Sequence, residues 1–368
     1  MIKPFYILLL SLSFIAFTST DCKHTPSGPD DTTKVDTTSH AFTFQQYSWG
    51  GGGGSFFQDV AILSDTNIWA VGEVNIIEYD STGTQIYTPY GAAHWDGANW
   101  KLVKLPTNIG LTYTQYLSST GIITFGSNDI WIANPGGVHK FDGNKITQSY
   151  WLAKYPGNTG VLDNGQIVQK IWGTSDNNLY AVGMGGAIAH FDGRSWQKLS
   201  SPTSLDIMDI YGATNPKTGE LEILAIATQT DSLPAQSQLL KIDGTTVTIV
   251  NTFTKVYFST WFVPGEKYYL AGDGIMCNTS FNNSDWTNYP IGTITSYGTG
   301  CISGMGLNDI FATGSYMEVV HYNGSTWYNY KNEIPSAYGT YSSVTIHGNI
   351  MVAVGLVDQN AVLLMGTR

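Results

Sequence analysis

Three histidines recur at one position of a repeated sequence pattern, and their imidazoles could bind a metal ion. They are His94, His190 and His321, and two other repeats carry Lys140 and Lys241 at the same position. A metal site needs its ligands within one coordination sphere, whereas equivalent positions of different repeats are a whole structural unit apart. We therefore predict a polar structural role for this position, and neither a metal site nor a cofactor.

Carboxylates are the groups that a carbohydrate-active enzyme would use. Hydrolysis of a glycosidic bond needs two carboxyl groups, about 5–5.5 Å apart in a retaining enzyme and about 6.5–9.5 Å apart in an inverting one. The candidates are Glu73, Glu78, Asp80, Glu266 and Asp273. Because the sequence does not place them relative to one another, a glycosidase, lyase or glycosyl transferase-like enzyme remains the alternative function.

Aromatic residues gather where the repeat is interrupted, in an insertion at 73–90 and in irregular segments at 111–116 and 150–155. The candidates for ligand binding are Tyr87, Tyr90, Tyr113, Tyr116, Tyr150, Trp151 and Tyr155. Loops on a rigid scaffold are where binding residues concentrate. These rings could stack on sugars or contact a protein surface, and the alternative is that they only pack the loops down.

The elements that must position these residues follow a long repeat. Its clearest copies read Asn67-Ile-Trp-Ala-Val-Gly72, Asn178-Leu-Tyr-Ala-Val-Gly183 and Asp309-Ile-Phe-Ala-Thr-Gly314. The seven equivalent anchor residues are Trp69, Trp131, Tyr180, Leu224, Tyr269, Phe311 and Val352. A period of forty-odd residues built from short strand-like segments is typical of a β-propeller, in which each repeat forms one blade.

Each repeat predicts four antiparallel strands. Asp-Gly or Asn-Gly pairs such as Asp192-Gly193 favour tight hairpins between the third and fourth strands, and a recurring tryptophan such as Trp196 then packs blade against blade. The last repeat has only three strands, and residues 41–49 can supply the fourth. We predict an all-β, seven-bladed propeller over 41–368, closed by its N-terminal strand. Six or eight blades are the alternatives, and Gly50–Gly54 is predicted to be a hinge after the closing strand.

The N-terminal residues predict export from the cytoplasm. Residues 1–21 have the basic start and apolar stretch of a signal peptide, and 22–40 form a polar tether that cannot bury enough apolar surface to fold. An apolar signal, Cys22 and a tether together resemble a bacterial lipoprotein, which implies acylation of Cys22 and a place at the outer membrane or cell surface. Asp21 departs from the usual small residue, so a secreted protein is the alternative.

Two further cysteines lie in the predicted propeller. Cys277 falls in the third strand of blade five and Cys301 in the first strand of blade six. Because extracytoplasmic proteins can form disulfides, we predict a bond between them, and two buried thiols are the alternative.

The repeat is similar to those of secreted bacterial β-propellers of the Kelch, galactose-oxidase-like and BNR type, over residues 41–368. The resemblance implies the fold and no particular activity. A sialidase would need three arginines around its substrate's carboxylate, and the sequence has only Arg194 and Arg368. Nothing marks the crosslinked tyrosine and histidine ligands of a copper radical oxidase.

The net charge narrows the class of partner. The chain has 17 Lys and Arg against 28 Asp and Glu, a formal charge of −11, which repels the phosphates of nucleic acids. We predict a monomeric, non-enzymatic binding or scaffold protein that engages a polysaccharide or a protein surface and meets a membrane only through a lipid anchor.

Overall fold

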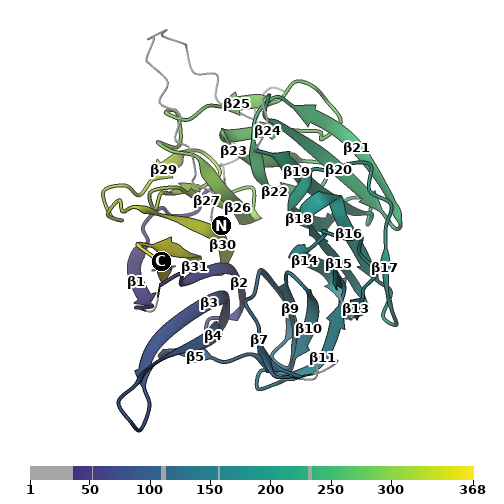
Figure 1. The fold of residues 1–368 in the computed structure, drawn as a ribbon. Coiled ribbons are helices and arrows are strands. Elements are labelled where there is room, and N and C mark those ends of the chain that lie inside the picture. Colours follow the sequence, from purple (N-terminus) through teal and green to yellow (C-terminus); the bar gives the residue numbers. More distant parts are fainter. Residues whose placement is uncertain (1–35, 52, 109–112, 156–157, 231–233) are drawn as a thin grey trace. The chain divides into compact units, whose positions relative to one another are not determined.

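The computed structural model describes residues 36–368 except 52, 109–112, 156–157 and 231–233, and these residues form a seven-bladed β-propeller (Figure 1). Blade one consists of β2 (Phe56–Ser64), β3 (Asn67–Tyr79), β4 (Gln85–Trp95) and β5 (Trp100–Val103). Blade two consists of β8 (Gly121–Gly126), β9 (Asp129–Asn134), β10 (Gly137–Phe141) and β11 (Ile146–Trp151). Blade three consists of β14 (Val168–Ser175), β15 (Asn178–Gly183), β16 (Ala187–Phe191) and β17 (Trp196–Lys198). Blade four consists of β18 (Asp206–Thr214), β19 (Leu221–Gln229), β20 (Gln236–Asp243) and β21 (Thr246–Phe253).

Blade five consists of β22 (Tyr257–Val263), β23 (Lys267–Gly272), β24 (Gly274–Asn278) and β25 (Thr287–Tyr289). Blade six consists of β26 (Thr299–Gly306), β27 (Asp309–Gly314), β28 (Val319–Tyr322) and β29 (Trp327–Asn329). Blade seven combines β30 (Gly339–His347), β31 (Ile350–Val357) and β32 (Asn360–Thr367) with the N-terminal β1 (Thr43–Trp49). Two short ribbons, β6 (Pro106–Thr107) with β7 (Gln115–Tyr116) and β12 (Lys154–Tyr155) with β13 (Asn158–Thr159), and one 3-10 turn, Met184–Gly186, lie in connections.

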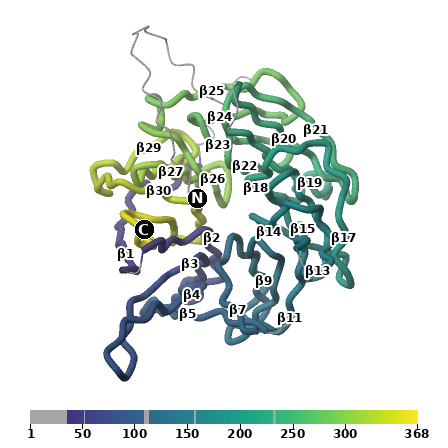
Figure 2. Tube along the Cα trace, in the orientation of Figure 1, coloured from purple at the N-terminus to yellow at the C-terminus, as the bar shows by residue number. Residues whose placement is uncertain are grey.

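The predicted fold is confirmed. Every anchor residue lies on the second strand of its blade, and the first strand of each blade is its innermost one, since the chain runs outward through each four-stranded sheet. In Figure 2 the trace passes around the ring from purple to yellow. β1 pairs antiparallel with β32 from Thr43↔Thr367 to Trp49↔Ala361, so the N-terminal strand closes the ring as expected.

The Asp-Gly pairs form the predicted turns. Asp96 Oδ1 accepts hydrogen bonds from the backbone N–H groups of Ala98 (3.0 Å) and Asn99 (2.8 Å), while Gly97 has φ 92°. That left-handed conformation is one that residues with a Cβ rarely adopt. The same turn recurs at Asp142-Gly143, Asp192-Gly193 and Asn323-Gly324.

The hydrophobic core lies between neighbouring blades. Trp131 and Tyr150 of blade two pack on Phe191 and Trp196 of blade three, with Phe191 centred 5.6 Å from Trp131 and 5.3 Å from Tyr150. A single blade leaves such side chains exposed, so burial of apolar surface stabilises the whole ring rather than each repeat.

The two rims of the ring differ. We call the rim where the inner strands begin the upper face; it carries the connections between blades and the turns between second and third strands. The opposite rim, with the Asp-Gly turns, is the lower face. On the upper face β3 pairs with β2 only up to Glu73↔Phe56, and beyond this pair it continues with β4 as a two-stranded extension, which we call the ribbon (74–90).

Residues 36–42, which we call the strap, reach β1 along the lower edge of blade six. The Thr38 N–H donates to the Asn323 carbonyl (3.1 Å) and Asn323 Nδ2 donates to the Thr38 carbonyl (3.2 Å). Asn308 Nδ2 donates to Asp36 Oδ2 (3.0 Å), and Phe42 is buried in the core. Residues 36–40, assigned to the tether from their polar composition, are therefore hydrogen-bonded to the propeller. The rest of the predicted signal and tether, with Cys22, lies outside the described residues.

Candidate functional site

The seven predicted aromatic residues all belong to upper-face segments of blades one and two and of the connections that follow them, but they divide into two groups. Four have exposed rings, with exposed fractions of 58% for Tyr87, 62% for Tyr113, 45% for Tyr116 and 40% for Tyr155. We call these the rim tyrosines. They are the ones that a partner can reach.

The other three predicted residues are half-buried and pack. Tyr150 lies in the core between blades two and three, and the Trp151 ring meets His139 at 4.9 Å. Tyr90 donates its hydroxyl to Glu78 Oε1 (3.2 Å), beneath Lys104. For these three the packing alternative holds.

The ribbon presents further apolar surface. Tyr79 and Ile86, near its tip, are 69% and 41% exposed. Residues alternate between the faces of a strand, so Val74, Ile76 and Tyr90 meet the core while the pair Ile77↔Tyr87 faces the other way. A two-stranded ribbon is marginally stable alone, and this one is held by its core-facing side chains.

The candidate carboxylates do not gather. Glu266 lies in the lower-face turn between β22 and β23, and Asp273 in the upper-face turn between β23 and β24. On the ribbon, a hydrogen bond from Thr88 Oγ1 (2.6 Å) is the main reason why the pKa of Glu78 is lowered. Asp80 accepts from Thr82 and Thr84 in the tip turn, which lowers its pKa too. Carboxyls held ionised in this way are poor proton donors for glycoside cleavage.

A ring of channel-lining residues was not predicted from the sequence. In six blades the pairing of the first and second strands shifts by one residue near the upper face, and the residue after the shift lines or borders the channel. The equivalent residues, including the one in blade two, form what we call the channel ring: Asp59, Gly121, Lys170, Asp209, Ser259, Cys301 and Ser343.

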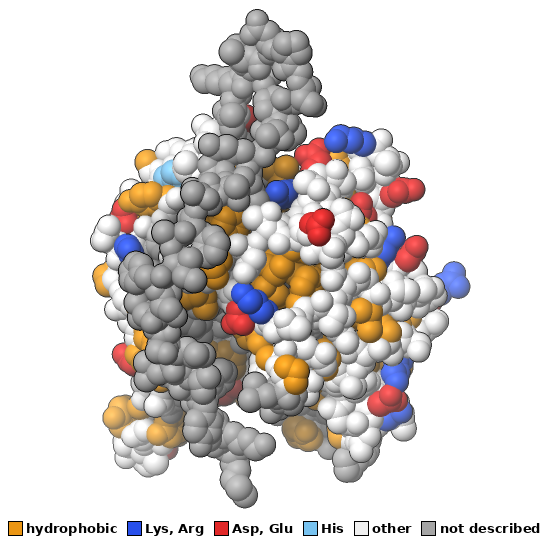
Figure 3. Space-filling model, turned by 90° about the horizontal axis from the view of Figure 1, so that it is seen from above, with side chains coloured by type: hydrophobic (Ala, Val, Ile, Leu, Met, Phe, Trp, Pro, Cys, Tyr) orange, Lys and Arg blue, Asp and Glu red, His pale blue; other side chains and the backbone are white. Residues whose placement is uncertain are grey.

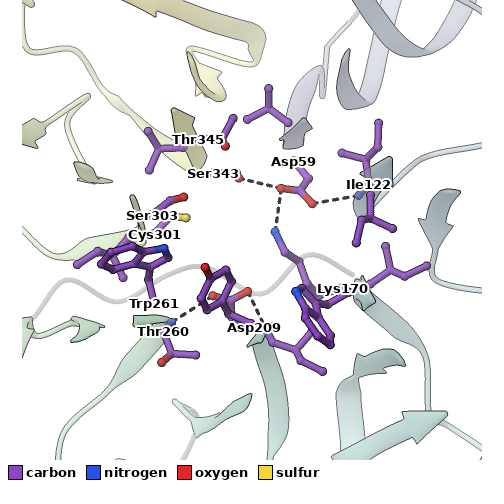
Figure 4. Close-up of a pocket in the computed structure, with 18 residues that line it drawn as sticks. Asp59, Ile122, Lys170, Asp209, Thr260, Trp261, Cys301, Ser303, Ser343 and Thr345 are labelled. Carbon is purple, nitrogen blue, oxygen red and sulfur yellow. Dashed lines mark hydrogen bonds and ion pairs between the residues drawn. The ribbon is translucent and has the colours of Figure 1, made fainter. Parts of the chain in front are cut away.

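Asp59 is the residue of the channel ring that accepts hydrogen bonds from three other blades. Its Oδ1 accepts from Lys170 Nζ (2.8 Å) and from Ser343 Oγ (2.8 Å), and its Oδ2 accepts from the Ile122 N–H (3.0 Å), as Figure 4 shows. Burial by itself lowers the pKa of Lys170, but the carboxylates of Asp59 and Asp209 outweigh it and raise that pKa above its usual value. The lysine is therefore held as a cation.

Residues of the channel ring join several pairs of neighbouring blades. Asp59 accepts from the backbone of blade two, Asp209 Oδ2 accepts from the Thr260 N–H of blade five (3.1 Å), and Ser259 Oγ accepts from the Ile302 N–H of blade six (3.2 Å). Burial raises the pKa of Asp209 and that of the Cys301 thiol. These contacts describe a structural belt around the channel rather than a pair of groups for acid–base catalysis.

The cavity inside this ring has a volume of about 210 Å³, below the range of about 300–1,000 Å³ usual for small-molecule sites. Trp172, Tyr211 and Trp261 contribute to its wall. Within the part of the chain that the structure describes, no three His, Cys, Asp or Glu residues are placed to hold a metal ion.

The recurring histidines lie at the strand ends that we predicted. His94 Nε2 meets Asn67 Oδ1 at 3.0 Å, and its ring stacks on the anchor Trp69 at 4.1 Å. His190 with Asn178 and Tyr180, and His321 with Asp309 and Phe311, repeat this arrangement. In blade two, Lys140 takes the position, 2.9 Å from Asp129 and over the Trp131 ring. In these four blades the position bonds to the start of the second strand at the lower end.

The predicted disulfide is not formed. The structure has no bond between Cys277 and Cys301. Cys301 lies on the innermost strand of blade six and borders the channel, whereas Cys277 is buried on the third strand of blade five. Adjacent blades are in contact, but these two strands lie at different radial positions, which keeps the two sulfurs from pairing.

Histidines with lowered pKa values predict a loss of stability in acid. Burial, with a smaller contribution from His321, lowers the pKa of His40 to about 4, and burial lowers that of His139 to about 3. Below the ordinary value of 6.5, the unfolded chain binds protons that the folded chain does not, so unfolding becomes more favourable as pH falls toward 4. We expect a lower Tm at about pH 4.5 than at about pH 7.

The His40→Gln variant should lose part of this pH dependence, because one of the histidines with a lowered pKa is gone. The exposed His347 provides the matched control, and His347→Gln should leave the dependence unchanged. Equal Tm values at both pH values for the wild-type chain would contradict the prediction.

Comparisons with known proteins identify the fold. No protein-family model matches the sequence, and no curated protein sequence matches it. YCF48 bound to a D1 peptide superposes with a TM-score of 0.59 at 14% identity, covering 88% of this chain and 95% of that chain. The WD40 β-propeller domain of Doa1 (TM-score 0.54, 11% identity, 89% and 98% covered) and YCF48 from Cyanidioschyzon merolae (0.53, 14%, 87% and 98%) are similar as well.

At these identities the likeness shows a β-propeller and no more, and the resemblance to Kelch, galactose-oxidase-like and BNR propellers stays a prediction. Among the described residues, no helix has the length and apolar character needed to span a membrane.

Proposed function

We propose that this chain is a non-enzymatic binding protein that docks a partner protein on the upper face of blades one to three. The observation that carries the proposal is the set of rim tyrosines beside the exposed face of the ribbon. Tyrosine is enriched at protein interfaces because it offers a large apolar ring with a polar tip. The solved structure of YCF48 with a D1 peptide supports a peptide-binding role for a propeller of this kind.

The chemistry of the channel favours binding over catalysis. Both aspartates of the channel ring accept hydrogen bonds from neighbouring blades, and the cavity beside them is small. The five candidate carboxylates are divided between the two faces. A carbohydrate-active enzyme would need two free carboxyls converging on one cleft, so the alternative function has less support.

The strap suggests how the binding face is presented. Because the strap lies against the lower edge of blade six, the chain enters the propeller on the side opposite the rim tyrosines. We propose that residues 1–21 are removed on export and that an acylated Cys22 anchors the tether, so that the upper face is directed away from the membrane. Labelled fatty acid that the chain incorporates, and that the Cys22→Ser variant does not, is the test of the anchor.

Docking is tested with two variants, each of which carries one photo-crosslinking amino acid. One variant has it in place of Tyr116, and the other has it in place of Lys145, which lies in a lower-face turn. Position 116 should give a discrete protein adduct in cells of the source organism, and position 145 should not. Changing both Tyr87 and Tyr155 to Ala should weaken binding of the identified partner by about tenfold or more, since exposed tyrosines are frequent hot spots. Equal adducts at both positions, or turnover of a polysaccharide by the purified chain, would exclude the proposal.

A further inference from the structure

A second candidate site lies at the outer edge of blade six, well away from the rim tyrosines. A pocket of about 250 Å³ opens between β29 and the connection from blade five to blade six. Trp327, Asn329 and Lys331 contribute from the β29 side, and residues 292–296 form the opposite wall. Trp327 and Asn329 alternate on one strand, so they point to the same side of the blade. We call this the blade-six pocket.

The lining of the blade-six pocket is polar and mostly neutral. Its lining consists of hydroxyls from Thr293, Thr295 and Ser296, the Asn329 amide, the Trp327 indole, the apolar side chain of Ile294, Gly292 and a single cation, Lys331. Thr295 is only 2% exposed, and its Oγ1 has no hydrogen-bond partner. A buried hydroxyl without a partner is unfavourable, and a ligand hydroxyl in the pocket would satisfy it.

Glu318 fixes the wall of the pocket and sets its charge. This buried carboxylate accepts from the Ser296 N–H (2.7 Å), the Tyr297 N–H (3.1 Å) and Asn329 Nδ2 (2.7 Å). The N–H groups of Gly292 and Thr293 are used within the loop as well. The wall therefore has no row of free N–H groups to pair with an added peptide strand, and the adjacent carboxylate disfavours an anionic ligand.

A line of tyrosines continues from the pocket onto the upper face. Tyr297 follows Ser296 in the chain, and its ring lies 4.4 Å from that of Tyr316, which lies 6.4 Å from Tyr338. Tyr338 is 73% exposed. Tyr316 and Met317 have φ of 57° and 63°, which is strained for residues with a side chain, and such strain persists where the surroundings hold it. Here the Tyr316 N–H donates to the Gly339 carbonyl (2.8 Å).

We propose that the blade-six pocket and this line of tyrosines bind a neutral oligosaccharide. A pyranose ring has an apolar C–H face that stacks on an indole or phenol ring and a rim of hydroxyls that bond to neutral polar groups. One sugar ring lies on Trp327 with its hydroxyls toward Thr295 and Asn329, and further rings extend over Tyr297 and Tyr316. Most of the surface in Figure 3 is uncharged, with acidic and basic side chains scattered over it.

The proposal is tested by isothermal titration calorimetry of the purified chain with cellohexaose, maltohexaose and xylohexaose, and with hexagalacturonic acid as the anionic probe. At least one neutral probe should bind, and the acidic probe should not. The Trp327→Ala variant should weaken that binding by about tenfold or more, whereas Tyr79→Ala, which removes an exposed ring from the ribbon, should not change it.

The Thr295→Val variant tests whether a loss of affinity can occur without a loss of stability. It removes a hydroxyl that has no partner in the free protein, so the Tm should stay the same or rise slightly, while affinity for the neutral probe falls. Failure of all three neutral probes to bind, or unchanged binding in Trp327→Ala, overturns the proposal. Partner docking at position 116 is independent of Trp327, so the two proposals can fail separately.

Discussion

A chain that begins at Ser55, and so lacks the strap and β1, is expected not to form a monomeric folded propeller. β1 supplies the fourth strand of blade seven over seven residue pairs. Tyr47 and Trp49 of β1 also pack against the core between blades seven and one. Phe44 of β1 and the preceding Phe42 pack between blades six and seven. Loss of a single buried aromatic costs about 3–5 kcal/mol, and a whole protein is stable by only about 5–15 kcal/mol.

The truncation also exposes β32. The outer edge of this strand would lie unpaired along its length, and such an edge promotes association with other chains. Size-exclusion chromatography and thermal unfolding should therefore show aggregates without a cooperative transition. A control chain that begins at Asp36 keeps the strap and should melt like the longer chain. A peptide of residues 36–50 added in trans should restore some monomer, and a cooperative, monomeric chain from Ser55 would show that the ring does not depend on β1.

The architecture was predictable because its signals are local and repeated. Asp-Gly turns such as Asp192-Gly193 specify hairpins through positive φ at glycine, and the continuous apolar run around Tyr180 specifies a strand buried on both faces. Seven copies of these signals reinforce each other, and the predicted count of seven blades, with six or eight as alternatives, is confirmed. The closing strand was predictable for the same reason, since the last repeat lacks one strand.

The channel ring was not predictable, because its position depends on a register shift. A shift by one residue moves every later side chain of a strand to the other face, so the alternation that identifies an inner strand does not say which residue meets the channel. The seven residues at this position also differ in type, from Asp59 and Lys170 to Gly121. No residue type recurs often enough at the channel-ring position to identify it from the sequence.

Exposure of aromatic side chains was equally hidden from the sequence. Tyr150 and Tyr155 occur in one short segment, yet Tyr150 packs in the core and Tyr155 is exposed. Which of them is exposed depends on the neighbouring blade, which the local sequence does not describe. The strap shows the opposite case: its composition predicts a tether, but Thr38 and Asp36 bond to turns of blade six that lie about 270–285 positions later.

Asp59→Ala is expected to be the most damaging single substitution in the channel ring. The carboxylate bonds blades one, two, three and seven together through Ile122, Lys170 and Ser343. Removing it leaves Lys170 without its ion-pair partner, with Asp209 as the remaining carboxylate that acts on it. Breaking a buried ion pair by removing one partner costs about 3–5 kcal/mol. Urea unfolding should show the loss as a shift of the midpoint with little change in slope.

Two further variants locate the cause of that loss. The double variant Asp59→Ala/Lys170→Met removes the stranded lysine charge together with its partner, and it should recover part of the lost stability. The recovery is incomplete because the buried Asp209 loses the nearby cation that favours its charged form. Asp285→Ala, at an exposed turn, should change stability by less than about 0.5 kcal/mol. If Asp59→Ala unfolds at the wild-type midpoint, or if the double variant is no more stable than the single one, then the ion pair between Asp59 and Lys170 does not hold the blades together.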